Sequence, residues 1–184
     1  MIWFTSDWHL GHEAILEHCE PRSGRFHCVE EMDAAILGET NAALNEGDQL
    51  WHLGDFCWRA SKAGHYRQQL RRGVKLHIVR GNHDASSLAR QCSSFHEIVV
   101  RRFVDKTFHL CHYPLFSWYQ ENHGGYHLYG HCHGSMEAAL NALQPGRMAM
   151  DVGIDAAAQI LGHYRPFSVE EVLNILRTRP LGSS

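Results

Sequence analysis

The chain of 184 residues has an ordinary globular composition, with 44% hydrophobic and 20% charged residues. This balance excludes a disordered polymer, and a chain of this length is expected to form one domain with a real core. The 17 Lys and Arg residues against 20 Asp and Glu give a net charge of −3, which excludes a global positive field for nonspecific binding of nucleic acid or anionic lipid. Histidine is the compositional outlier, with 16 residues.

The sequence also limits compartment and domain organisation. It contains no apolar run of the length that spans a membrane, and its first residues lack the basic-then-apolar pattern of a signal peptide. The six cysteines form no C-x-x-C pair, which predicts reduced thiols. We therefore expect a cytoplasmic protein that does not contact the membrane. A single domain is expected over 1–180, followed by a tail, LGSS (181–184), that could have been added in cloning.

Apolar runs that end in polar or glycine-bearing turns predict most of the strands, and helical spacing with end signals predicts the helices. In chain order, the predictions are a strand over 2–7, a helix over 29–47, a strand over 49–55, a helix over 61–73, strands over 75–82, 106–113, 126–131 and 147–155, and a helix over 168–180. The last helix opens with a capping box, Ser168 to Glu171. This order predicts a layered α/β or α+β domain.

Metal-binding residue types follow or end five of the predicted strands. They are Asp7, His9, Asp55, Asn82, His112, His131 and His133. Because residues i and i+2 of an extended chain point to the same side, we expect Asp7 with His9, and His131 with His133, to converge. The mixture of carboxylate, imidazole and amide oxygen favours borderline divalent ions, with Mn²⁺ first and Fe, Zn²⁺, Ni²⁺ or Co²⁺ as alternatives. Seven ligands exceed the needs of one ion, so two neighbouring ions with one shared bridge are predicted, and their excess positive charge favours a phosphate group.

The order of these motifs resembles that of the calcineurin-like metallophosphoesterase superfamily. The motifs are Asp7-Trp8-His9, Gly54-Asp55, Gly81-Asn82-His83-Asp84, His112 and Gly130-His131-Cys132-His133. They span residues 5–133, and further segments extend the resemblance to the compact bacterial and phage members as far as about residue 176. Five motifs in order are far more specific than any one of them.

The resemblance implies a four-layer α/β/β/α sandwich and a role for each motif residue. Asp7, His9 and His133 should hold the first metal, and Asn82, His112 and His131 the second, with Asp55 as the bridge. His83 should contact the phosphoryl group and protonate the leaving oxygen, and Asp84 should orient His83. The implied reaction is in-line attack on phosphorus by a hydroxide bound to the two ions, with no covalent protein intermediate.

The predicted function is therefore hydrolysis of small phosphoesters, nucleotide-like or broad in range. Monoesters and diesters both stay open, and the lack of an added cap domain favours diesters or broad specificity. A nuclease acting on nucleic-acid ends is an alternative, although the net charge does not indicate a track for a strand. A non-catalytic scaffold of the same fold should lack ligands, whereas here every motif position is filled, and a histidine-rich metal buffer should lack the strand-end order.

Several further residues are candidates for substrate contact or for packing. His12, Arg59 and Arg80 lie close to motif ends and are predicted to contact the substrate. The aromatic residues Trp8, Trp58, Trp118 and Tyr119 could stack a base, although burial is the commoner fate of such residues. Cys57, Cys111 and Cys132 neighbour ligand positions and are predicted to pack in the core, as are His52 and His77.

Overall fold

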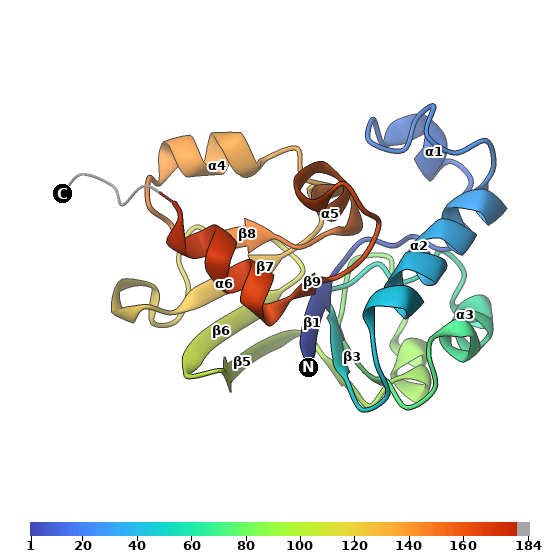
Figure 1. Ribbon diagram of the computed structural model, residues 1–184, viewed down its shortest axis with the longest axis horizontal. Helices are drawn as coiled ribbons and strands as arrows, with labels where there is room; N and C mark the ends of the chain where they lie inside the picture. Colours follow the sequence, from blue (N-terminus) through green and yellow to red (C-terminus); the bar gives the residue numbers. More distant parts are fainter. Residues whose placement is uncertain (180–184) are drawn as a thin grey trace.

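The computed structural model describes residues 1–179, which form two β-sheets flanked by helices (Figure 1). The five-stranded sheet has the order β4-β3-β2-β1-β9, with β1 Ile2–Thr5, β2 Gln49–His52, β3 Lys75–Val79, β4 Ser94–His96 and β9 Phe167–Ser168. The four-stranded sheet has the order β5-β6-β7-β8, with β5 Ile98–Phe103, β6 Lys106–Cys111, β7 Tyr126–Tyr129 and β8 Ala149–Asp151. Neighbouring strands are parallel except for β9 against β1 and β5 against β6.

The helices lie on the outside of the sheets. They are α1 Ile15–His18, α2 Val29–Ala43, α3 Ala63–Gln69, α4 Glu137–Leu143, α5 Ile154–Leu161 and α6 Val169–Arg177, with short 3₁₀ turns η1 Ala60–Lys62, η2 Ser86–Gln91 and η3 Glu121–His123. Figure 1 shows α2 and α3 on one side of the molecule and α4, α5 and α6 on the other. Within residues 1–179, no helix combines the length and apolar composition needed to cross a bilayer.

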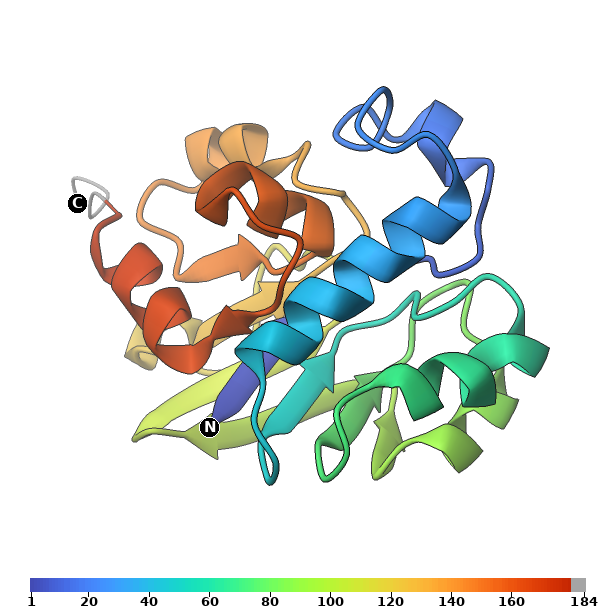
Figure 2. The same cartoon turned by 45° about the vertical axis from the view of Figure 1, so that its right-hand side comes forward.

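Successive side chains along each strand point to opposite faces of the sheet, and this divides the core into two main layers. Trp3, Leu50 and Leu76 align across β1, β2 and β3 and belong to the cluster that packs under α2, which Figure 2 shows crossing the face of the sheet. The next residues along two of these strands, Phe4 and Trp51, point the other way, into the cluster between the two sheets. This is the period of two expected of strands that are covered on both faces.

A smaller cluster covers the outer face of the four-stranded sheet. It contains Trp118, Tyr129 and Ala149, with Leu140 of α4 packed against it. The predicted arrangement of two mixed sheets between layers of helices is confirmed.

The predicted elements are present, but their ends differ from the predicted ones. The strands predicted to end at residues 7, 55 and 82 stop at Thr5, His52 and Val79, so the ligand candidates lie on loops. The strand predicted over 147–155 is wrong in its last part, because a helix, α5, starts at Ile154 after Gly153. The helix predicted over 29–47 ends at Ala43. Residues 180–184, including the expected tail, lie outside the described residues.

Candidate metal centre

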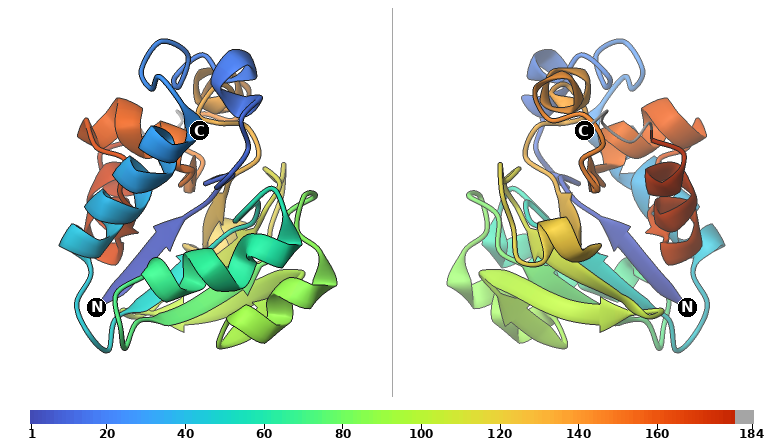
Figure 3. Two further views of the ribbon diagram at one scale, coloured as in Figure 1. Left: turned by 90° about the vertical axis from the view of Figure 1, so that its right-hand side faces the viewer. Right: turned by 90° about the vertical axis from the view of Figure 1, so that its left-hand side faces the viewer.

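The candidate ligands meet where the carboxyl ends of parallel strands from both sheets come together. Asp7 and His9 follow β1, Asp55 follows β2, Asn82 follows β3, His112 follows β6, and His131 and His133 follow β7. Figure 3 shows β1 running from the N-terminus toward the end of the molecule where α1 lies, and the segment after it continues in that direction. The carboxyl ends of parallel strands are the usual position of ligand sites in open α/β sheets.

An unusual backbone conformation, and not strand alternation, brings the ligands together. Asp7, His9, Asp55, His131 and His133 have φ between 50° and 69°, in the left-handed region. Only eight non-glycine residues of the described chain adopt positive φ, and five of them are candidate ligands. Non-glycine residues avoid this region on steric grounds, and exceptions cluster at functional sites. Asp7 and His9 do converge, but the expected reason, that residues i and i+2 of an extended chain point to the same side, was wrong, because both residues are in the left-handed region.

Glycines of the motifs allow the ligand loops to touch. Gly54 has a φ of 104°, and a Cβ built on it would lie 2.6 Å from both the Cα and the N of Gly81. A Cβ on Gly81 would in turn meet the Asp55 carboxylate, and one on Gly130 would meet that of Asp7. The glycines that precede Asp55, Asn82 and His131 in the sequence are thus required for close approach of the backbone.

One group of candidate ligand atoms consists of Asp7, His9 and His133, whose donor atoms lie within 4.8 Å of one another. The rings of His9 and His133 are nearly parallel, with centroids 5.3 Å apart. Asp7 is fully buried, and its Oδ2 accepts a hydrogen bond of 2.9 Å from the backbone amide of His131. Burial raises the pKa of Asp7, an effect that a nearby cation would offset.

A second group surrounds Asn82. Its Oδ1 lies 2.9 Å from His112 Nε2 and 3.1 Å from His131 Nδ1. Asp55 lies between the two groups, with Oδ2 3.5 Å from His9 Nε2 and 3.5 Å from His112 Nε2. Burial would raise the pKa of Asp55, but the hydrogen bond and charge of His112 outweigh burial and hold the pKa well below its usual range.

Two observations show that divalent ions fit these groups. First, Asp7 Oδ1 and both ring nitrogens of His9 are buried and have no hydrogen-bond partner among the described residues. Buried polar atoms without partners are costly, so a ligand that pairs with them is expected. Second, His112 Nδ1 lies 2.7 Å from the carbonyl oxygen of Leu53 and donates to it, so Nε2 faces the centre, where a metal ion would take the place of its proton.

Sequence reasoning missed a buried ion pair behind His133. Asp155, in the first turn of α5, lies 2.6 Å from His133 Nδ1, and Arg22 donates to it at 2.8 and 2.7 Å. Arg22 also donates to the backbone oxygens of Asp7 and Trp8, and both Arg22 and Asp155 are fully buried. Burial disfavours a proton on His133, but the hydrogen bond that His133 donates to Asp155 prevails and raises the pKa of His133 to about 10. Such carboxylate–histidine pairs are common behind metal ligands.

Asp84 accepts hydrogen bonds from backbone amides. The expectation that it orients the His83 ring does not hold in this structure. The Asp84 oxygens accept hydrogen bonds from the amides of Asp55 at 2.8 Å, Phe56 at 3.1 Å and Gly81 at 2.9 Å, and no contact with the His83 ring is found among the described residues. The physical reason is that the loop after β2 leaves buried amides unpaired, and Asp84 pairs them. His83 is exposed, and its amide donates to Asp55 Oδ1 at 2.9 Å.

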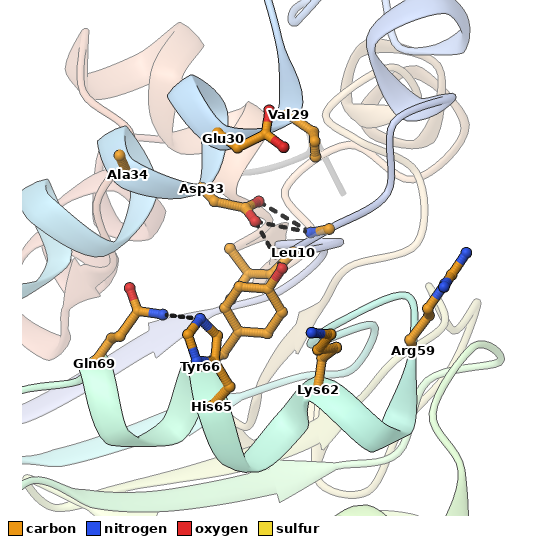
Figure 4. Close-up of a pocket in the computed structure, with 11 residues that line it drawn as sticks. Leu10, Val29, Glu30, Asp33, Ala34, Arg59, Lys62, His65, Tyr66 and Gln69 are labelled. Carbon is orange, nitrogen blue, oxygen red and sulfur yellow. Dashed lines mark hydrogen bonds between the residues drawn. The ribbon is translucent and has the colours of Figure 1, made fainter.

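The three predicted substrate contacts have different surroundings. His12 lies beside the centre, with its ring centroid 5.4 Å from that of His9. Arg80 donates to the backbone oxygen of Asp84 and to Glu97 at 3.1 and 3.2 Å, so its guanidinium is held by protein groups instead of facing a phosphate. Arg59 is exposed and lines a neighbouring pocket of about 400 Å³ between α2 and α3 (Figure 4).

The three cysteines beside the candidate ligands are buried, and so are His52 and Asp151. Cys57, Cys111 and Cys132 are at most 9% exposed, and burial raises the pKa of the Cys57 thiol to about 12. His52 is fully buried against Trp8. Asp151, which the sequence did not single out, accepts hydrogen bonds from Gly134 and Gly153, and burial together with Asp7 raises its pKa to about 7.

The fold and the site define a class of protein in which loops from two stacked sheets bring carboxylate, imidazole and amide groups together as candidate metal ligands. The model of the family described as calcineurin-like phosphoesterase matches residues 1–164, and the chain belongs to this family. It is 25% identical over 176 residues to an uncharacterized protein of Methanocaldococcus jannaschii, covering 95% of this chain and 90% of that one. It is 31% identical over 84 residues to the Gene 66 protein of Mycobacterium phage L5, covering 45% of this chain and 39% of that one.

A solved structure has the same fold. The crystal structure of a protein of unknown function from Aquifex aeolicus matches with a TM-score of 0.75 and 22% identity, covering 95% of this chain and 98% of that chain. The predicted family and fold are thereby confirmed.

Proposed function

We propose that the protein is a phosphoesterase that uses two divalent metal ions, and that its substrates are phosphodiesters. Asp7, His9 and His133 would hold one ion, Asn82, His112 and His131 the other, and Asp55 both. Ions bound there would lower the pKa of a water molecule and stabilise the charge that develops on the phosphoryl oxygens. The observation that carries the proposal is the position of Asp55 Oδ2, 3.5 Å from a ring nitrogen of each group.

The chain itself supplies positioning and a proton. The His83 amide is fixed on Asp55 at 2.9 Å, so its exposed ring is held at the edge of the centre, 5.3 Å from the His9 ring. In the proposed reaction the protonated ring of His83 gives one proton to the leaving oxygen and becomes neutral imidazole. General acids of this kind contribute a rate factor of roughly 10² to 10⁴.

Two surfaces beside the centre favour diesters, which carry two organic groups, over monoesters, which carry one. One is a cavity of about 700 Å³ that is lined by His131 and His133 together with Ile15 and Met136. The rings of His12 and His83, next to His9, form the other surface. Arg80 donates to the backbone oxygen of Asp84 and to Glu97, so it would have to leave these partners to balance the extra charge of a monoester.

The test compares wild type with Asp55→Asn and with the control Asp105→Asn, another aspartate of positive φ, which pairs with Arg102 on the surface. In Mn²⁺ with bis-p-nitrophenyl and p-nitrophenyl phosphate, wild type should prefer the diester. The Asp55 variant should lose at least about 100-fold in kcat/KM, because one preorganised charged group typically has an effect of this size. It should also lose at least one metal ion by elemental analysis, whereas the control keeps both. Absence of metal-dependent turnover in wild type would refute the proposal.

His83→Ala tests the proposed acid role of His83 independently of metal binding. This variant should keep its metal content and lose a rate factor of roughly 10² to 10⁴. The loss should be greater for alkyl than for aryl esters, because an alkoxide needs a proton more than a nitrophenolate does. Equal losses on both kinds of ester would remove the acid role.

A further inference from the structure

One tryptophan is exposed beside the candidate metal centre. Trp58 is 42% exposed, whereas Trp3, Trp8, Trp51 and Trp118 are at most 8% exposed. Leaving a large aromatic side chain in water forfeits the free energy of burying it, so an exposed tryptophan at a site suggests a contact made by a ligand. Its backbone is anchored, since its amide donates to the oxygen of Leu10 at 3.0 Å.

The rings around Trp58 connect it to the metal ligands. The rings of Trp58 and His12 are parallel to within 2°, with centroids 3.8 Å apart. His83 lies 5.3 Å from Trp58 and 5.3 Å from His9, and His12 lies 5.4 Å from His9. Each of the four rings therefore lies next to two of the others, so the stacked pair of Trp58 and His12 adjoins both the candidate ligand His9 and the proposed acid His83.

The stacked pair is held in place from behind. Gly11, next to His12, donates to both oxygens of Asp33 at 3.0 Å, and the Tyr66 hydroxyl donates to Asp33 Oδ2 at 2.8 Å (Figure 4). Gly11 has a φ of 73°, and a Cβ built on it would lie 2.6 Å from the Tyr66 oxygen. Since these groups fix the loop, the pair is preorganised, and binding to it costs little ordering entropy.

We infer that the pair formed by Trp58 and His12 is a stacking platform for a nucleobase, so that the substrates are small nucleotide esters. This inference rests on the proposed function, because it places the phosphoryl group at the metal centre. A planar base gains from stacking on an indole, whereas a sugar or alkyl group gains much less. The net charge of −3 disfavours a long strand and favours a short nucleotide.

The experiment measures binding of AMP, ribose 5-phosphate and inorganic phosphate to the Mn²⁺-loaded full chain by calorimetry. In wild type, AMP should bind more tightly than ribose 5-phosphate by about 5- to 150-fold, the range that stacking of one base on an aromatic side chain provides. Trp58→Leu keeps an apolar side chain but removes the aromatic face, and should reduce this ratio to about 1. Trp58→Phe should keep most of the ratio.

Two controls keep the outcomes separate. Inorganic phosphate should bind all variants alike, because it contacts the metal centre and not the platform, and this arm also reports that Trp58→Leu is folded. Tyr119→Ala removes another exposed aromatic residue, 60% exposed, and should leave the ratio unchanged. If wild type binds phosphate but does not distinguish AMP from ribose 5-phosphate, or if Trp58→Leu keeps the wild-type ratio, the platform is refuted and the phosphoesterase stands. If wild type neither binds phosphate nor turns over bis-p-nitrophenyl phosphate, the proposed function itself fails.

Discussion

The buried pair of Arg22 and Asp155 should contribute to both folding and metal affinity, and Asp155→Asn tests both. The substitution keeps the shape of the side chain but removes the charge that Arg22 and His133 both contact. Arg22 and Asp155 are fully buried, so solvent cannot replace the lost partner. Breaking such a pair by removing one charge typically costs about 3–5 kcal/mol, because the other charge stays buried without compensation.

The same substitution removes the carboxylate that orients the His133 ring. Its Nδ1 lies 2.6 Å from Asp155, and loss of a carboxylate behind a metal-binding histidine typically costs about 10- to 100-fold in affinity. The free energy of unfolding is measured in urea with a chelator present, so that metal loss does not contribute, and Mn²⁺ affinity is measured separately by competition with an indicator. The two effects should therefore be seen independently in one variant.

A surface pair provides the control for this substitution. Arg80 and Glu97 are 39% and 73% exposed, and Glu97→Gln should change the free energy of unfolding by less than about 1 kcal/mol. A loss of the same small size in Asp155→Asn, together with unchanged Mn²⁺ affinity, would refute the role given to the buried pair.

Three further predictions concern the glycines, a helix cap and pH. Gly54→Ala should abolish metal binding, measured as metal content, because its Cβ would lie 2.6 Å from the backbone of Gly81. Gly38 lies in an open position of α2, so Gly38→Ala should instead raise the free energy of unfolding in urea by about 0.5–1 kcal/mol. Ser168→Ala should cost about 1 kcal/mol in urea, because it removes the capping bond to the Glu171 amide, and an unchanged midpoint would contradict this. Burial lowers the pKa of His127 to about 3, below the usual 6.5, so only the unfolded chain gains a proton there as pH falls below 6.5. Between pH 7 and 5, wild-type stability measured with chelator should then fall by about 2 kcal/mol more than that of His127→Gln; equal losses would disprove it.

Much of the fold could be predicted because its signals are local. The capping box of α6 forms as expected, with the Glu171 amide donating to Ser168 Oγ at 3.2 Å and the Ser168 amide donating to Glu171 Oε2 at 2.8 Å. Apolar runs identified six of the strands within a few residues. The α5 helix was missed because its first residues, Ile154 and Asp155, continue an apolar run, and only the break at Gly153 separates β8 from the helix.

The candidate site was predictable in residue type but not in geometry. Carboxylates and imidazoles at strand ends can be read directly from the chain, and the structure brings all seven together. Arg22 and Asp155 were not found, because they lie 133 residues apart, Arg22 belongs to no motif, and Asp155 lies in a segment, MDVGID, to which no role was given. The exposure of Trp58 was equally inaccessible, since burial depends on which residues pack around it and four of the five tryptophans are buried.

The left-handed ligands explain why the centre depends on the whole fold. Each non-glycine residue in this region costs about 1–3 kcal/mol, so no single loop would hold the conformation alone. The structure compensates by bonding the amides of these residues to neighbouring loops: Asp7 to the oxygen of Gly54 at 2.9 Å, His9 to that of Asp55 at 3.0 Å, and His131 to the Asp7 carboxylate at 2.9 Å. Because each loop is fixed by another that is distant in sequence, the ligands are preorganised by tertiary contacts, and a pattern within one motif cannot encode their convergence.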